Sequence, residues 1–340
     1  YSHRPGRNRH MTRLIAFVAV VAALFGAVAS SSSSSTQSTK DVKLTLVAYS
    51  TPREAYAKII EAFQKTPAGR DVSFDQSYGA SGEQSRAVEQ GLPADVIAFS
   101  LAPDITRLIP KGLVAKDWSN DAYRGMVTRS VVVFALRDGN PKKIRRWSDL
   151  TRSGIEVLTP NPFTSGGARW NVMAAYGAQI RLGKTHKQAV SYLENLFRHV
   201  PVQDKSARDS LQTFLGGKGD ALLAYENEAL FAQKKGQPVQ FVIPKETILI
   251  ENPVAVVKTS KHKTEARAFV RFLRSPEAQR IFAENGYRPV LKSVAKQYKF
   301  PSRPGLFRID RFGGWAKVDK RFFDPTRGIM AGIQRKIGQG

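Results

Sequence analysis

The chain has 340 residues, of which 42% are hydrophobic and 24% charged, a balance typical of a globular protein with one large or two smaller domains. It contains no cysteine, so disulfide bonds, thiolate metal sites and a cysteine nucleophile are excluded. The formal net charge is +25, and residues 1–40 hold five basic and no acidic residues, so residues 41–340 keep an excess of 20 positive charges. This charge bears on solubility and on anionic partners rather than on the fold.

The N-terminal region has the pattern of an export signal. Arg13 precedes an apolar run over residues 14–28, and small residues follow at 27–29. We expect residues 1–29 to comprise upstream residues and a signal peptide, with Met11 as the start, and residues 30–40 to form a serine-rich linker. The run is short for a membrane span, so an exported protein of the periplasm or cell envelope is the main prediction and an uncleaved anchor the alternative.

The first part of the exported chain alternates strands and helices. Apolar patterns predict strands at residues 43–49, 72–78 and 94–99, and helices at 53–64, 82–91 and 104–111. Ser81 and Gln84 match a capping box at the start of the second helix. Strand–helix alternation predicts a parallel α/β sheet with binding residues at the carboxyl ends of its strands.

The same alternation continues to the C-terminus. Strands are expected at residues 130–136, 155–159, 220–225, 239–243, 248–250 and 254–257, with a short extended piece at 201–203. Helices are expected at 147–150, 170–181, 187–198, 207–215, 226–234, 264–274, 276–285, 314–319 and 325–337. The fold class is therefore α/β, with two lobes and a ligand site in the cleft between them. We assign residues 41–128 and 252–340 to lobe 1 and residues 129–251 to lobe 2.

Turns rich in hydrogen-bond donors precede several of these helices. The central one is TSGGARW at residues 164–170, and others lie at Ser50, at GASG over residues 79–82, and at Ser206. A turn that opens a helix directs backbone N–H groups and the positive end of the helix dipole at one point, which suits an oxyanion. Their recurrence predicts an anion-binding cleft.

Other kinds of site find no support. The chain has no Walker or nucleophile-elbow pattern, and its five histidines lack metal-ligand spacing. Glu226 and Glu228 lie two apart, which does not place them on one helix face. We therefore expect no enzyme, no metal and no cofactor. Arg169 and Arg208 follow donor-rich turns and either contact the ligand or hold a loop through its carbonyl groups.

Several long motifs resemble the periplasmic sulfate-binding proteins of ABC transporters, a family that includes thiosulfate-binding proteins. They are YGASGEQ at 78–84, GLPADV at 91–96, TPNPFTSGGARWN at 159–171, YENEA at 225–229, PVAVV at 253–257, YRP at 287–289 and FGGW at 312–315. The resemblance covers residues 43–320. It implies a type II periplasmic binding fold closing around sulfate, and delivery of the anion to a membrane permease with its ATPase.

The resemblance also implies which groups hold the anion. Carried over by motif, they are the N–H groups of Ser50, Ser81, Gly166, Gly167 and Ala207, the hydroxyl of Ser165, and Tyr225, with Arg169 and Arg208 behind them. Tyr225 stands where the family has an indole, and the segment at 206–208 reads Ser-Ala-Arg where the family has Gly-Ala-Arg. A tyrosine hydroxyl donates a hydrogen bond but can also accept one.

The sequence leaves three further functions open. A molybdate or tungstate binder would need a larger cavity. A basic protein that binds nucleic acid or an anionic surface would gather Lys and Arg on one face. An enzyme acting on an oxyanion ester would need a nucleophile and a base, which the motifs lack. We expect a monomer that binds sulfate or thiosulfate and no nucleic acid.

Overall fold

The computed structural model describes residues 42–338. They lie within one compact unit, Thr39–Gly340. The expected signal peptide and serine-rich linker lie outside the described residues. Within residues 42–338, none of the helices combines the length and the apolar character that crossing a membrane requires.

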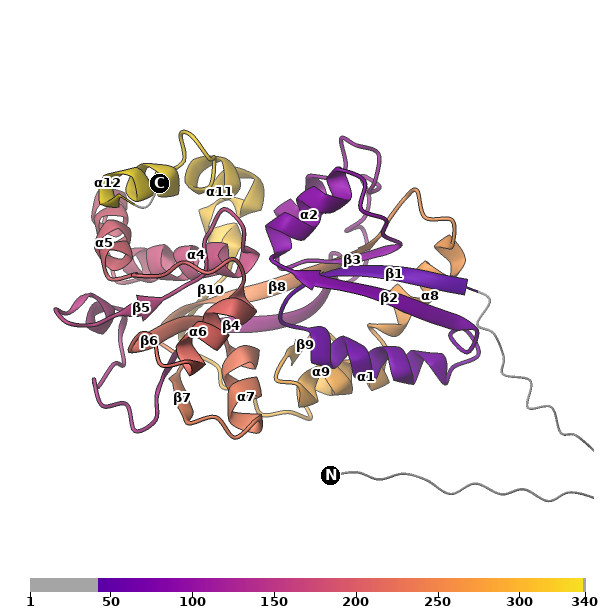
Figure 1. Cartoon of the computed structure of the whole chain (residues 1–340), viewed down its shortest axis with the longest axis horizontal. Coiled ribbons are helices and arrows are strands. Elements are labelled where there is room, and N and C mark those ends of the chain that lie inside the picture. The colour runs from indigo at the N-terminus through magenta and orange to yellow at the C-terminus, as the bar shows by residue number, and fades with distance from the viewer. Residues whose placement is uncertain (1–41, 339–340) are drawn as a thin grey trace, which may run out of the picture. The chain divides into compact units, whose positions relative to one another are not determined.

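The core of the fold is a mixed sheet with the main strand order β2-β1-β3-β8-β4-β6-β5 (Figure 1). Three short strands pair beside this path, β10 on β8 and both β7 and β9 on β4. The strands are β1 Val42–Tyr49, β2 Val72–Gly79, β3 Val96–Ala98, β4 Met126–Arg137, β5 Val157–Leu158, β6 Ala221–Tyr225, β7 Val239–Val242, β8 Glu246–Val256, β9 Arg288–Pro289 and β10 Gly305–Phe307.

Helices cover both faces of the sheet (Figure 1). They are α1 Arg53–Gln64, α2 Ser81–Glu89, α3 Ala102–Thr106, η1 Trp147–Thr151, α4 Gly166–Arg181, α5 His186–Arg198, α6 Ala207–Leu215, α7 Glu226–Lys234, α8 Lys263–Phe272, α9 Pro276–Glu284, α10 Lys292–Ala295, η2 Ile309–Phe312, α11 Gly314–Phe322 and α12 Ile329–Ile337.

Alternation along the strands divides the core into layers. In β4, Val132 and Phe134 point into a cluster formed with α4, α5, α11 and α12, whereas Val131 and Val133 point into a cluster with α6 and α7. In β1, Leu46 packs with α1, α8 and α9, while its neighbour Val47 packs with α2 and α3. Because successive strand residues face opposite sides, each sheet face receives its own helix layer.

The α/β class expected from the sequence is confirmed, and so is the parallel pairing of β1 with β2 and β3. The sheet as a whole is mixed, because β8 and β4 run antiparallel to their main neighbours. The strands expected at residues 248–250 and 254–257 form one strand, β8, which continues through Pro253. The helix expected at residues 104–111 ends at Thr106, and the last helix begins at Ile329 rather than 325.

The C-terminal helices lie against the β4–β6–β5 half of the sheet. Helix α12 packs on α5, and the α11 residues Trp315, Val318 and Phe322 belong to the cluster that contains α4. In Figure 1 these helices stand together on one side of the sheet. The lobe boundaries expected from the sequence stay a prediction. They assign the C-terminal helices to lobe 1, whereas these helices pack on α4 and α5, which the same boundaries assign to lobe 2.

Two helical glycines give opposite predictions for substitution by alanine. At Gly177 in α4, an added Cβ would lie 2.3 Å from Cε2 of Phe307 and 2.9 Å from Cζ of Phe312, whereas at Gly332 in α12 nothing lies within 4 Å. We expect Gly177→Ala to lower the free energy of unfolding by about 1–3 kcal/mol through overpacking. Gly332→Ala should raise it by up to about 1 kcal/mol through helix propensity. Urea unfolding measures both, and equal effects of the two substitutions would contradict the packing described.

Candidate anion-binding site

The site is built where strands end and helices begin. Ser50 follows β1, Ser81 begins α2 after β2, and Tyr225 ends β6 directly before α7. Gly166 and Ala207 are the first residues of α4 and α6. The N–H groups in a first helical turn have no carbonyl partner inside the helix. Several such groups, each at the positive end of a helix dipole, therefore need partners from elsewhere.

The glycines of the α4 turn lie in close contact with the other candidate residues. A Cβ at Gly167 would lie 3.1 Å from Cε2 of Tyr225, 3.2 Å from Cβ of Ala207 and 3.4 Å from Oγ of Ser165. The contact also brings the starts of α4 and α6 together with the end of β6. A side chain at this position would fit only if these neighbours moved slightly, so glycine allows the close approach without that movement.

Ser100 connects Ser81 at the start of α2 with Tyr225 at the end of β6. Its backbone N–H donates to Oγ of Ser81 at 2.9 Å, and its hydroxyl shares a 2.5 Å hydrogen bond with the hydroxyl of Tyr225. Its carbonyl accepts from Nε1 of Trp170 and Nδ2 of Asn252. A Cβ at Gly166 would lie 2.6 Å from Oγ of Ser100, so the α4 turn packs directly on this residue.

The hydroxyl of Ser165 accepts a hydrogen bond from its own helix. Ser165 caps α4, and its Oγ accepts a hydrogen bond from the N–H of Ala168 at 3.3 Å. Since the oxygen is used as an acceptor, the hydroxyl hydrogen remains for another partner. Ser50 lies close to α6, because its Oγ accepts from the N–H of Arg208 at 3.4 Å. The turns at Ser50 and Ala207 are thus linked, and the contact at Gly167 joins Ser165 to them.

The protonation of nearby groups is set by burial. Burial raises the pKa of Tyr225 well above its usual range, so its hydroxyl keeps its proton and can donate. Asp104 is 1% exposed, and burial raises the pKa of its carboxyl group, an effect that Arg169 and the hydrogen bond from Ser81 oppose. The hydroxyl of Ser81 donates to Oδ2 of Asp104 at 2.6 Å. This bond fixes the start of α2.

Arg208 ties the start of α6 to α1 and α7. Its guanidinium pairs with Glu54 and with Glu228, each through contacts of 2.8 Å, and donates to the carbonyl of Thr51 at 3.1 Å. Burial disfavours the charged form, but the two carboxylates outweigh it and raise the pKa of Arg208. Glu228 is 1% exposed, so its charge is buried and matched by the guanidinium.

Arg169 has a similar position behind the α4 turn. Its Nε donates to the carbonyl of Pro162 at 2.9 Å, and its Nη1 pairs with Asp319. Its guanidinium also lies over the ring of Phe323. Arg169 and Arg208 thus each hold a loop through a carbonyl group, one of the two roles that the sequence left open.

Sequence reasoning missed two members of this cluster and misassigned one cap. Ser100 follows β3, which is a usable signal, whereas the buried Asp104 resembles an ordinary acid in a first helical turn. The capping box expected at Ser81 and Gln84 is wrong. The structure has Ala80 as the residue before α2, and the Ser81 hydroxyl bonds to Asp104 while Gln84 bonds to Ser77.

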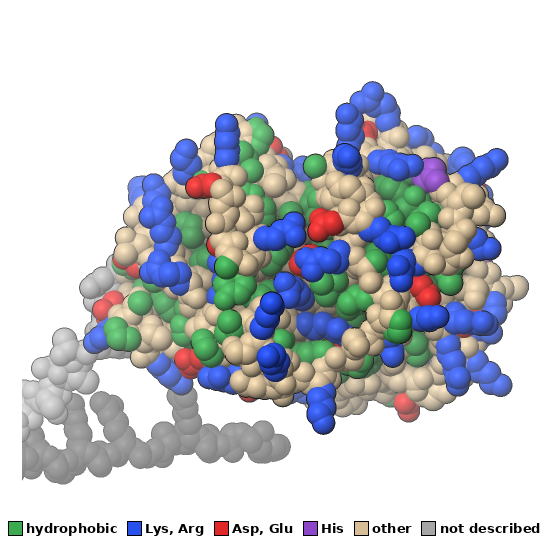
Figure 2. Space-filling view, turned by 180° about the vertical axis from the view of Figure 1, so that it is seen from behind, with side chains coloured by type: hydrophobic (Ala, Val, Ile, Leu, Met, Phe, Trp, Pro, Cys, Tyr) green, Lys and Arg blue, Asp and Glu red, His purple; other side chains and the backbone are tan. Residues whose placement is uncertain are grey.

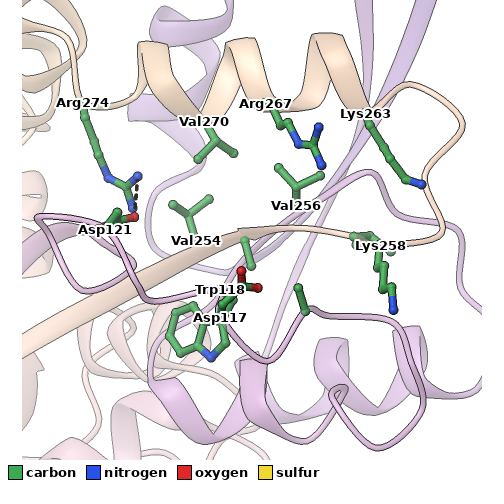
Figure 3. A pocket seen from close by; sticks show the side chains of 13 residues that line it. Asp117, Trp118, Asp121, Val254, Val256, Lys258, Lys263, Arg267, Val270 and Arg274 are labelled. Carbon is green, nitrogen blue, oxygen red and sulfur yellow. Dashed lines mark ion pairs between the residues drawn. The ribbon is translucent and has the colours of Figure 1, made fainter.

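A separate cavity of about 440 Å³ lies between α8, the loop at residues 115–121 and the end of β8. Figure 3 shows Val254, Val256 and Val270 pointing into it, with Arg274 paired to Asp121 at one end. It shares no residue with the donor-rich turns. Its lining does not bring several helix starts together, as the donor-rich turns do.

Replacement of Arg208 tests the ion-pair network. Arg208→Met leaves Glu228 buried without its partner, and we expect a loss of about 3–5 kcal/mol in the free energy of unfolding at pH 7. An acid whose pKa is raised in the folded state destabilises that state as the pH rises, so the loss should shrink at pH 5. Urea unfolding at both pH values measures this.

The matched control is the double variant Arg208→Met with Glu228→Gln. It removes the unpaired charge and should recover most of the lost stability. A double variant as unstable as the single one would show that the charge on Glu228 is not the cause.

Comparison with known proteins agrees with this arrangement. Residues 44–288 match the family model described as "Bacterial extracellular solute-binding protein". The chain is 44% identical to a sulfate-binding protein of Synechococcus elongatus over 83% of this chain and 84% of the relative. It is 35% identical to a thiosulfate-binding protein of Pseudomonas aeruginosa over 82% of this chain and 88% of the relative.

Among solved structures, the sulfate-binding protein SubI from Mycobacterium tuberculosis H37Rv matches with a TM-score of 0.81 and 44% identity. The match covers 83% of this chain and 100% of that one. The sequence comparison and the structure comparison thus both match this chain to sulfate-binding proteins. The chain belongs to the family of bacterial extracellular solute-binding proteins, in the group of the sulfate-binding proteins.

Proposed function

We propose that this protein captures sulfate outside the cytoplasm by closing buried hydrogen-bond donors around the anion. The backbone N–H groups of Ser50, Ser81, Gly166, Gly167 and Ala207, together with the hydroxyls of Ser165 and Tyr225, form the donor set. The observation that supports the proposal most is that Tyr225, Ala207 and Ser165 lie close around Gly167, so three elements that carry candidate donors meet there.

The donor set suits a fully ionised oxyanion. Backbone N–H groups donate only, and a protonated anion such as hydrogen phosphate would also need an acceptor. Arg169 and Arg208 are engaged with carboxylates and carbonyl groups, so the ligand is held by dipoles rather than by a direct cation. Thiosulfate has the same charge and tetrahedral form, and it is the ligand most similar to sulfate.

Larger oxyanions and nucleic acid have less support as ligands. Molybdate and tungstate share the charge but are larger, and they would need a larger cavity than sulfate does. For a nucleic-acid binder, Lys and Arg would have to gather in one stripe with aromatic residues. On the face in Figure 2, Lys and Arg side chains are instead spread over the surface.

We further propose that the protein works outside the cytoplasmic membrane as a monomer and delivers its ligand to an ABC permease with its ATPase. The membership of the chain in an extracellular solute-binding family supports this location. The basic surface would raise the rate at which anions reach the protein.

Calorimetric titration with sulfate, thiosulfate, molybdate and phosphate tests the ligand. We expect one-to-one binding of sulfate and no competition from phosphate. Ser165→Ala should weaken sulfate binding by about 10- to 100-fold, because a hydrogen bond to a charged group contributes about 1.5–3 kcal/mol. Tyr225→Phe should cause a loss of the same order.

Ser148→Ala is the matched control, since this side chain is exposed and lies in η1, away from the donor-rich turns. Ser165→Ala also removes a helix cap, so unfolding must be measured for the same samples. Wild-type affinity in the Ser165→Ala variant would exclude the α4 turn as the site. Binding of molybdate with silence toward sulfate would replace the proposed ligand.

A further inference from the structure

A second cavity, of about 720 Å³, lies beside the buried turns. Residues of α2, α3, the loop before α4, and α11 line it. Its charged lining consists of four cations and two carboxylates, namely Arg86, Arg107, Arg169, Lys320, Asp319 and Asp324. In Figure 1, α2 and α11 stand on the same side of the sheet.

Two of its arginines form no ion pair within residues 42–338, namely Arg86 and Arg107, and Nε of Arg107 is buried there without a hydrogen-bond partner. The cations also repel one another. Burial lowers the pKa of Arg86, and the positive charges of Arg107 and Arg169 lower it further, although Asp104 and Glu83 oppose the shift. An anion between these side chains would relieve both the repulsion and the missing hydrogen bond.

The cavity adjoins the inner site where the α2 turn meets the α4 turn. The N–H of Gly82 donates to the carbonyl of Thr164 at 3.0 Å and so joins the two turns. A Cβ at Gly82 would lie 2.9 Å from that carbonyl oxygen and 3.4 Å from Nη1 of Arg86. Arg86 therefore lies directly against the junction of the two turns.

The carboxylates give this cavity hydrogen-bond acceptors beside its arginine donors, a combination that the donor-rich turns lack. Oδ1 of Asp324 accepts from the N–H groups of Arg327 and Thr326 and from the Thr326 hydroxyl, at 2.8–3.0 Å. Those bonds lower the pKa of Asp324 to about 2, so it is ionised at neutral pH. Its second oxygen, Oδ2, can therefore accept from a proton-bearing group. Asp319 is already paired with Arg169.

We propose that this outer cavity binds a phosphate group, with Arg86 and Arg107 donating to its oxygens and Asp324 accepting from its P–OH. Guanidinium groups match the geometry of phosphate oxygens, and a carboxylate acceptor selects the protonated oxyanion. The inner site holds a proton-free anion with donors alone, so the two sites select different oxyanions. The outer site does not depend on sulfate binding at the inner one.

The test is a titration with inorganic phosphate at low ionic strength, after the inner site has been saturated with sulfate. We expect one phosphate to bind, and Arg86→Gln with Arg107→Gln to weaken it at least tenfold while sulfate affinity stays within twofold. Asp324→Asn should shift the preference of the outer cavity from phosphate toward sulfate. Glycerol 3-phosphate as a second probe distinguishes a monoester from inorganic phosphate as the bound form.

The matched control is Arg70→Gln with Arg145→Gln, which removes two exposed charges that do not line the cavity. Equal weakening in this control would mean a general charge effect and overturn the proposal. So would unchanged phosphate affinity in the Arg86 and Arg107 double variant, or phosphate that displaces sulfate. Failure of the proposed function would appear as silence in the sulfate titration, and the phosphate titration of the wild type and the Arg86 and Arg107 double variant would then be made without added sulfate.

Discussion

The structure depends on how the backbone N–H groups in the first turns of its helices find hydrogen-bond partners. Helices α2, α4 and α6 begin close to one another, and each brings N–H groups that have no partner inside the helix. Burying such groups unpaired is costly, so the junction is stable only when the turns bond to one another or to an anion. The bond from Gly82 to Thr164 and those around Ser100 satisfy part of this demand. The donors that remain are the ones a small oxyanion would satisfy.

The same constraint explains the glycines and arginines around the junction. Gly166 allows α4 to approach Ser100 more closely than a side chain would permit, and Gly167 allows a tight contact with Tyr225. Arg208 compensates two carboxylates, so a bound anion would be held by dipoles and not by this cation. Charge is therefore kept near the site but neutralised, and an anion held in this way can leave without breaking an ion pair.

Much of this could be predicted from the sequence because it is local. Strand ends, helix starts and the SGG turn are set by residues within a few positions of each other, and the structure has most of them where those residues predict. What failed depends on distant partners. The Ser81 hydroxyl bonds to Asp104 and not within its own helix, and the hydroxyls of Ser100 and Tyr225 meet across 125 residues. No local pattern announces such contacts.

The two strands expected at residues 248–250 and 254–257 are one continuous strand in the structure, although Pro253 lies within it. Proline interrupts a strand only where its missing N–H is needed. In the structure Pro253 pairs with Met126, where the β4–β8 register shifts, so the ladder tolerates it.

That register shift has a mechanical consequence. Strands β4 and β8 are long, with 12 and 11 residues, and each pairs with strands from both halves of the sheet. A change in the angle between the β1–β3 side and the β5–β6 side of the sheet would therefore have to bend or twist both continuous strands. It could not be confined to a flexible loop. The ladder between β4 and β8 is irregular between Met126 and Thr128, so regular pairing is interrupted at that point.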